Sequence, residues 1–155
     1  MATRLREHPL PDYEADAAGW AEAQAAALRE RRADLLDWDN LALEVFDVSS
    51  RERDKIESAM AVLIAHLLKW DMQPARHSLS WFLTVSEQRR RIERGFHDNP
   101  SLRPRAGQLL LDSYRGGRTE AARQMRVLPK TLPADCPYTY DEIITRPVEW
   151  DGETA

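Results

Sequence analysis

The sequence has few residues that can supply covalent or metal-based stability. Cys136 is the only cysteine, so no disulfide can form within the chain, and no cysteine and histidine cluster has zinc-site spacing. The longest apolar run, residues 59–65, is far shorter than the roughly 20 residues of a membrane-spanning helix. The first 16 residues lack the apolar core of a secretion signal. We therefore expect a cytoplasmic protein that is stabilised by packing and has no membrane segment.

Motifs of catalysis and of repeat folds are also missing. The sequence has no glycine-rich phosphate loop, no useful run of alternating apolar and polar residues, and no repeat with a period of about 20–50 residues. Cys136 lies between Asp135 and Pro137 in a proline-rich tail without a predicted base beside it, which disfavours nucleophilic catalysis. We expect no cofactor.

Charge is distributed unevenly over a chain of ordinary globular composition. The 155 residues include 31% charged and 43% hydrophobic residues, which is typical of one compact domain. The net charge is −4, yet residues 74–128 contribute +6, and all of their basic residues are arginines. Dedicated nucleic-acid binders are usually basic overall. We therefore interpret the arginine-rich run Arg89–Arg94 first as a solvated helix face, with nucleic-acid binding as an alternative.

Helical periodicity dominates the apolar pattern. The predicted helices are 16–32, a shorter one of about nine residues capped by Asp39 or Asn40, 51–72, one from Ser78 or Ser80 to about Phe96, and 100–125. Pro74 ends the third of these, because proline lacks the backbone donor that a helix needs. Gly116 and Gly117 predict a break or kink in the last, since each glycine costs about 1 kcal/mol relative to alanine.

These elements predict an all-α fold with about five helices in a bundle. We expect residues 1–155 to form a single helical domain, with a core over about 12–128 and a proline-rich tail, 129–155, packed across it. The tail has one short helix at most, started by a capping box of Thr139 and Glu142. The two longest helices are expected to fold back on each other around Pro74 and form the spine.

Polar side chains gather in this predicted hairpin, residues 66–94. His66, Lys69 and Gln73 share one flank of helix 51–72, and Gln88 falls on the inner stripe of the next helix. A buried glutamine without a partner costs about 1–3 kcal/mol. Either His66 and Gln88 bond to backbone and to each other, which fixes helix register, or the cluster lines a site for an anionic ligand or a partner. The candidate ligand-binding residues are His66, Lys69, Gln73, Arg76, Trp81, Gln88 and Arg89.

A metal site is a third interpretation of the same segment. His66 with Glu44 and Glu87 would form a metal-dependent hydrolase or nuclease site in the bundle interior, with Lys69 or Arg89 facing a phosphate. The pattern is weak, because no two of these ligands have the spacing of a helical metal motif. We assign no metal ligand from the sequence.

Short strings along nearly the whole chain add a family resemblance. They are Tyr13, Asp16 and Trp20; Leu36-Asp37, Asn40-Leu41 and Glu44; His66–Trp70, Gln73-Pro74, Arg76, Ser80-Trp81 and Glu87–Arg89; Pro100–Leu102, Tyr114 and Cys136–Thr139. Together they resemble the bacterial domain-of-unknown-function family 29. The resemblance implies a small all-helical fold without an assigned activity. Leu43 and Phe46 stand where the family tends to place further glutamates, which argues against a multinuclear metal centre, and His77 replaces a residue that is commonly arginine.

The function that the sequence favours is a non-catalytic helical binding module. Its hairpin, residues 66–94, would contact a partner protein or an anionic ligand, and a homodimer is compatible with this interpretation. The metal-dependent enzyme and the nucleic-acid binder remain the alternatives.

Overall fold

The computed structural model describes residues 10–152. Over this range the chain forms five α-helices connected by short 3₁₀ helices, without a β-strand. The predicted all-α fold is confirmed. The chain divides into two compact units, Met1–Ser49 and Ser50–Ala155. Within the described range, no helix combines the length and hydrophobicity that crossing a membrane requires.

The N-terminal unit is organised by two capping aspartates. Asp16 caps α1 (Ala17–Arg29), accepting a hydrogen bond from the Gly19 amide at 2.9 Å. After the 3₁₀ helix η1 (Ala33–Leu35), Asp37 accepts from the amide of Asn40 at 3.3 Å and begins the next helix. Asp39 and Asn40, the predicted caps, lie inside that helix instead. The Trp20 indole donates to the same Asp37 carboxylate at 3.0 Å, so one aspartate both caps a helix and holds α1.

The helix that follows, α2, runs without a break from Trp38 to Met72. The prediction of a separate short helix before residue 51 is therefore wrong. The composition of α2 explains why the helix is continuous. It contains neither proline nor glycine, and Ser49 and Ser50 each cost only a few tenths of a kcal/mol in a helix interior.

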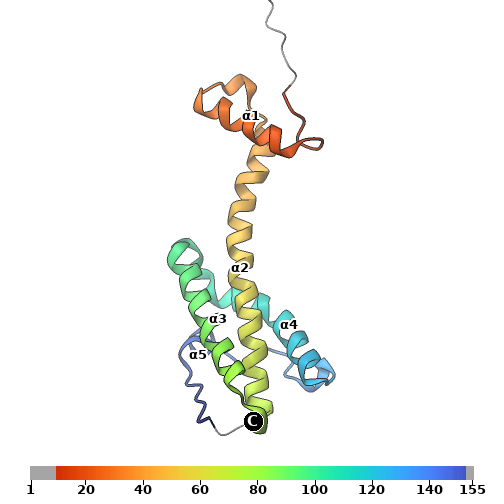
Figure 1. The fold of residues 1–155 in the computed structure, drawn as a ribbon, viewed down its shortest axis with the longest axis vertical. Helices are drawn as coiled ribbons and strands as arrows, with labels where there is room; N and C mark the ends of the chain where they lie inside the picture. The colour runs from red at the N-terminus through yellow and green to blue at the C-terminus, as the bar shows by residue number, and fades with distance from the viewer. Residues whose placement is uncertain (1–9, 153–155) are drawn as a thin grey trace, which may run out of the picture. The chain divides into compact units, whose positions relative to one another are not determined.

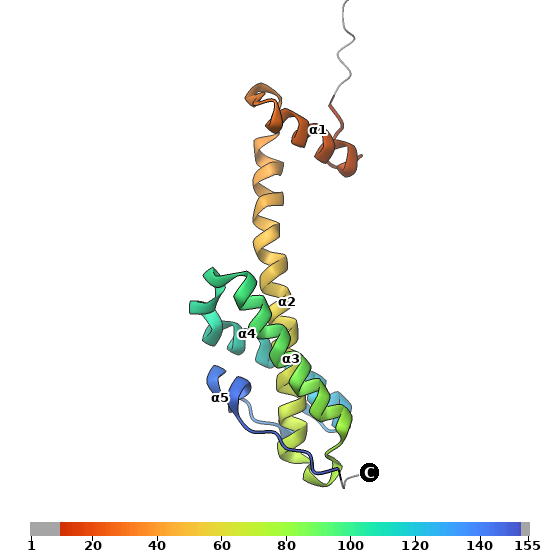
Figure 2. The ribbon, with the colours of Figure 1, turned by 60° about the vertical axis from the view of Figure 1, so that its left-hand side comes forward.

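In the C-terminal unit the chain reverses at Pro74, as predicted. Pro74 opens the 3₁₀ helix η2 (Pro74–Arg76), and Ser78 caps α3 (Leu79–Asp98). A further 3₁₀ helix, η3 (Pro100–Arg105), leads into α4 (Ala106–Met125). α3 and α4 pack on different sides of α2 (Figures 1 and 2). Buried apolar side chains of the three helices form one core, including Ile56, Met60, Leu63, Ile64, Ile92, Phe96, Leu109 and Leu110.

α4 is continuous through its glycine pair, so the predicted break at Gly116 and Gly117 is wrong. Gly117 is buried, and a Cβ added there would lie 2.7 Å from the Ala61 carbonyl oxygen and 2.8 Å from the Ile64 Cβ. Gly117 therefore permits a close approach of α4 to α2, and this packing outweighs the low helix propensity of glycine.

The C-terminal tail packs on this unit and contains the 3₁₀ helix η4 (Pro129–Thr131) and the short helix α5 (Tyr140–Thr145). The predicted capping box is present: the Thr139 amide donates to Glu142 at 2.7 Å, and the Glu142 amide donates to the Thr139 hydroxyl at 3.2 Å. Leu132, Ile143 and Val148 are buried and join the core. The tail is therefore part of the packed fold.

Candidate functional site

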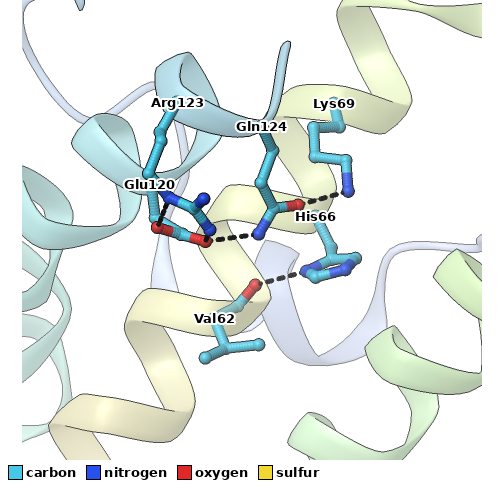
Figure 3. A network of polar contacts seen from close by, with 6 residues as sticks. All are labelled: Val62, His66, Lys69, Glu120, Arg123 and Gln124. Atoms are coloured by element: carbon cyan, nitrogen blue, oxygen red, sulfur yellow. Dashed lines mark hydrogen bonds and ion pairs between the residues drawn. The ribbon is translucent and has the colours of Figure 1, made fainter. Parts of the chain in front are cut away.

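Three of the predicted site residues, His66, Lys69 and Trp81, lie close together where α2 packs against its neighbouring helices. Lys69 is only 5% exposed, and its Nζ donates to the Gln124 side-chain oxygen of α4 at 2.6 Å (Figure 3). The same ammonium lies 4.2 Å from the centroid of the Trp81 ring of α3, a cation–π distance. The His66 Nδ1 lies 2.9 Å from the Val62 carbonyl oxygen. Lys69 thus connects α2 to both neighbouring helices.

The network continues along α4 to a carboxylate. Gln124 donates to Glu120 at 2.6 Å, and Arg123 donates to the other oxygen of Glu120 at 2.8 Å (Figure 3). These hydrogen bonds, Arg123 first, lower the pKa of Glu120 to about 2. The buried ammonium of Lys69 is therefore linked to a carboxylate through one amide.

Burial controls the ionisation of the two basic groups in this network. It lowers the pKa of Lys69, and it lowers the pKa of His66, where the nearby charge of Lys69 acts in the same direction. His66 is therefore predominantly neutral at pH 7. The His66 ring and the Lys69 ammonium both have hydrogen-bond partners within the fold. We therefore interpret this network as a structural connection between helices.

Arg89 is directed to the tail. Its Nε donates to the Ile143 carbonyl oxygen at 2.8 Å, and its terminal nitrogen donates to the Arg146 carbonyl oxygen at 2.7 Å. Both acceptors lie at the end of α5, where helix carbonyls lack partners within the helix. Arg89 therefore holds α5 against α3.

Gln73 and Arg76 lie at the hairpin turn. Gln73 is half-buried at the residue before η2, and Arg76 is exposed. The turn itself is closed by His77, whose Nε2 lies 2.8 Å from the Trp70 carbonyl oxygen and whose ring stacks on the Trp70 indole at 3.7 Å. His77 thus packs against Trp70 of the core.

Gln88 lines a groove between α2 and α3 with a volume of about 820 Å³. The residue is 8% exposed, and its side-chain amide makes no hydrogen bond to residues 10–152 but reaches solvent in the groove. Val62 is half-buried in the groove, and the buried side chains of Ile56 and Ala59 lie at its floor. The other lining residues are Arg51, Glu52, Asp54, Lys55, Ser58, Arg90, Arg91, Arg94, Gly95 and Asp98.

The α3 side of this groove is rich in arginine. Arg90 and Arg91 both donate to Glu87, and Arg94 lies 3.6 Å from Asp98. Glu87 is a single carboxylate shared by two guanidinium groups, and their hydrogen bonds lower its pKa. The groove lining contains five basic and three acidic residues, so its electrostatic potential favours an anionic occupant.

A model of the family described as "Domain of unknown function DUF29" matches residues 13–148. The chain belongs to this family. The resemblance inferred from short sequence strings is thereby confirmed. No curated protein and no solved structure matches the chain.

The three residues of the alternative metal site, Glu44, His66 and Glu87, are engaged separately in this DUF29 chain. Glu44 accepts from the Tyr13 hydroxyl at 2.8 Å in the N-terminal unit, Glu87 binds two arginines, and His66 contacts its own helix. Residues 10–152 contain no group of three or more histidine, cysteine or acidic side chains placed to hold a metal ion.

Sequence reasoning missed two groups of residues in this DUF29 chain. One group is Glu120, Arg123 and Gln124 of α4. Arg123 and Gln124 follow Glu120 by three and four residues, a spacing at which side chains on a helix surface can bond, so this network could have been predicted from the sequence. The other is the tail anchor at Asp71, which accepts from the Tyr138 hydroxyl at 2.7 Å and from Arg146 at 2.9 Å. Tyr138 belongs to the Cys136–Thr139 string, so the family resemblance was its only signal.

Proposed function

We propose that this chain is a non-catalytic protein-binding module of the cytoplasm that takes an acidic, amphipathic helix of a partner into the α2–α3 groove. The observation that carries the proposal is the groove itself, in which an apolar floor of Ile56, Ala59 and Val62 lies beside a rim with five basic residues. Gln88 also lines the groove, and its solvent-accessible amide can bond to a carbonyl oxygen or a polar side chain of a bound polypeptide.

The shape of the groove favours a helical occupant. Its α2 side extends from Arg51 to Val62, about 17 Å along the helix axis, which matches three turns of a ligand helix. The apolar floor of the groove, formed by Val62 with the buried Ile56 and Ala59, suits ligand side chains spaced three and four residues apart, as in other helix-in-groove complexes.

Charge favours acidic residues beside those anchors. Arg91 and Arg94 border the groove on α3, and Lys55 borders it on α2. Existing carboxylates neutralise part of this charge, which weakens the alternative of nucleic-acid binding by Arg89–Arg94, since Arg89 is also occupied by the tail. In this proposal His66, Lys69 and Trp81 hold α2 in place beside the groove, Arg89 holds the tail on α3, and Gln73 and Arg76 lie at the turn outside it.

The test is a selection of helical peptides against the full chain. A library with randomised positions on a helical background is selected on the wild type and counter-selected on Ser58→Trp, which places an indole in the groove. We expect enriched peptides to carry apolar residues at helical spacing flanked by glutamate or aspartate. Binding measured by fluorescence anisotropy should weaken at least about tenfold in Arg91→Glu, because a desolvated charge pair becomes a repulsion.

The matched control is Arg115→Glu, which makes the same charge change at an exposed arginine of α4 outside the groove. It should leave peptide affinity unchanged beyond the small effect of net charge. Enrichment of basic peptides, equal binding to Ser58→Trp, or no enrichment at all would each refute the proposal. Single-stranded DNA is titrated in parallel, and tight binding with a steep salt dependence would favour the nucleic-acid alternative instead.

A further inference from the structure

The first three turns of α2 carry large apolar side chains that remain exposed. Trp38 is 62% exposed, Val45 71%, Phe46 65% and Val48 58%. At 100° per residue these four side chains, together with Ala42, fall on one half of the helix circumference. The acidic residues of the same turns, Asp39, Glu44 and Asp47, fall on the other half. The helix therefore presents an uncharged apolar face, which we call the α2 N-terminal face: Trp38, Ala42, Val45, Phe46 and Val48.

The N-terminal unit has a small core of its own. Among residues 10–49, the apolar side chains that are fully buried are Trp20 and Ala27. A unit of about 40 residues usually needs a disulfide, a metal or association with another chain to be stable. Residues 10–49 contain no cysteine. The largest apolar surface of the N-terminal unit, the α2 N-terminal face, is therefore exposed and is not buried in a core.

From these observations we infer that the α2 N-terminal face pairs with the same face of a second copy of this chain, in an antiparallel two-fold contact centred on Val45. The apolar pattern is symmetric about that residue at the centre of the contact: Ala42 of one copy meets Val48 of the other, and Val45 meets Val45. At each end, Trp38 of one copy lies at the level of Glu52 of the other, whose carboxylate is bonded to Lys55 and Asn99 of its own chain. Phe46 then lies beside Phe46 across the two-fold axis. Such a contact is isologous, because both copies use the same surface. It therefore stops at a dimer, in which the face of each copy is covered by the other.

The area of the face is sufficient for such a dimer. An aromatic side chain can bury about 150–250 Å², so Trp38 and Phe46, with Val45 and Val48, would remove about 1,000 Å² from solvent over two copies, the threshold for a specific interface. Ala42 and Ser49 at the centre of the seam are small, which lets the two helices approach closely.

Charge selects the orientation. Residues 10–49 include ten acidic and three basic side chains, and Asp34, Asp37 and Asp39 are concentrated around the start of α2. A parallel pair would place these acidic ends together. An antiparallel pair places them at opposite ends of the contact and also opposes the two helix dipoles. The five residues of the face carry no charge, and the carboxylate at each end of the seam, Glu52, is bonded to Lys55 and Asn99.

The first test is the oligomeric state of the full chain by analytical ultracentrifugation. We expect a dimer for the wild type, and a dissociation constant at least about 100-fold weaker for Val45→Glu, which puts two carboxylates together in the apolar seam. The matched control is Leu43→Glu: Leu43 is 57% exposed on the same helix but lies on the half that carries the acidic residues. It should remain dimeric. Circular dichroism establishes that both variants keep their helix content, and Val45→Ser replaces Val45→Glu if the latter unfolds.

The second test fixes the orientation by oxidative cross-linking in a Cys136→Ser background. Val45→Cys should cross-link to itself, because the two-fold axis passes beside residue 45, whereas Trp38→Cys should not. A monomeric wild type, or loss of the dimer in Leu43→Glu equal to that in Val45→Glu, would overturn the inference. Cross-linking of both cysteine variants would show a parallel pair and overturn the antiparallel arrangement. The peptide-binding groove involves none of these residues, so the two proposals stand or fall separately.

Discussion

Substitution of the two adjacent glycines of α4 by alanine is expected to have opposite effects on stability. Alanine is more favourable than glycine inside a helix by about 0.8–1 kcal/mol, and this gain applies to Gly116 and Gly117 alike. At Gly116 the added methyl group would lie 3.8 Å from the Ala61 Cβ, an ordinary contact. Gly116→Ala should therefore raise the free energy of unfolding by up to about 1 kcal/mol.

At Gly117 the methyl group would lie 2.7 Å from a backbone oxygen of α2 and 2.8 Å from the Cβ of Ile64. Favourable carbon contacts need about 3.5–4.0 Å, so α2 and α4 would have to separate by about 1 Å. Neither obstacle is the end of a flexible side chain. Overpacking of this kind costs about 1–3 kcal/mol, and after the propensity gain of about 1 kcal/mol we expect Gly117→Ala to destabilise the fold by up to about 2 kcal/mol.

Thermal unfolding followed by circular dichroism at 222 nm measures both effects. Gly117→Ala should lower Tm by up to about 8 °C, and Gly116→Ala should leave it unchanged or raise it. Urea titration gives the two free energies independently. A Gly117→Ala protein as stable as the Gly116→Ala protein would refute the close helix approach as the reason for this glycine.

Three further predictions concern the polar contacts of the C-terminal unit. Gln124→Ala should destabilise by about 1–3 kcal/mol, because it removes the hydrogen-bond partner of buried Lys69, whereas Lys69→Met should be neutral or stabilising in urea titrations. Because Glu120 has a folded-state pKa of about 2, below its unfolded value of 4.5, its contribution to stability is present above pH 4.5 and lost as pH falls towards 2. Glu120→Gln should flatten this loss in thermal scans between those pH values. Tyr138→Phe should cost about 1 kcal/mol by removing its bond to Asp71, and an unchanged urea midpoint would argue against that contact.

Local signals in the sequence were sufficient for part of the fold. Pro74 and Ser78 fixed the hairpin, since a proline ring and a capping hydroxyl act on their own backbone neighbours. The pair Thr139 and Glu142 fixed the start of α5 for the same reason. Propensity misled at Gly117, where the deciding contacts come from α2, more than 50 positions away in the sequence.

The candidate site also combines local features that the sequence predicts with long-range contacts that it does not. A helical wheel places His66 and Lys69 on one flank of α2, and the structure agrees. It gives no means of finding that Lys69 bonds to Gln124, 55 positions away, or that Arg89 caps carbonyls of α5. Long-range pairings depend on how helices pack, and a single sequence carries no record of that packing.

The C-terminal tail is bonded to all three long helices of its unit. Arg146 and Tyr138 reach Asp71 of α2, Arg89 of α3 reaches α5, and Tyr114 of α4 donates to the Pro133 carbonyl oxygen at 2.6 Å. The tail therefore connects the three helices, because one helix cannot move along another without breaking hydrogen bonds to the tail. Amide hydrogen exchange in α3 and α4 should in consequence report a single cooperative opening rather than two independent ones.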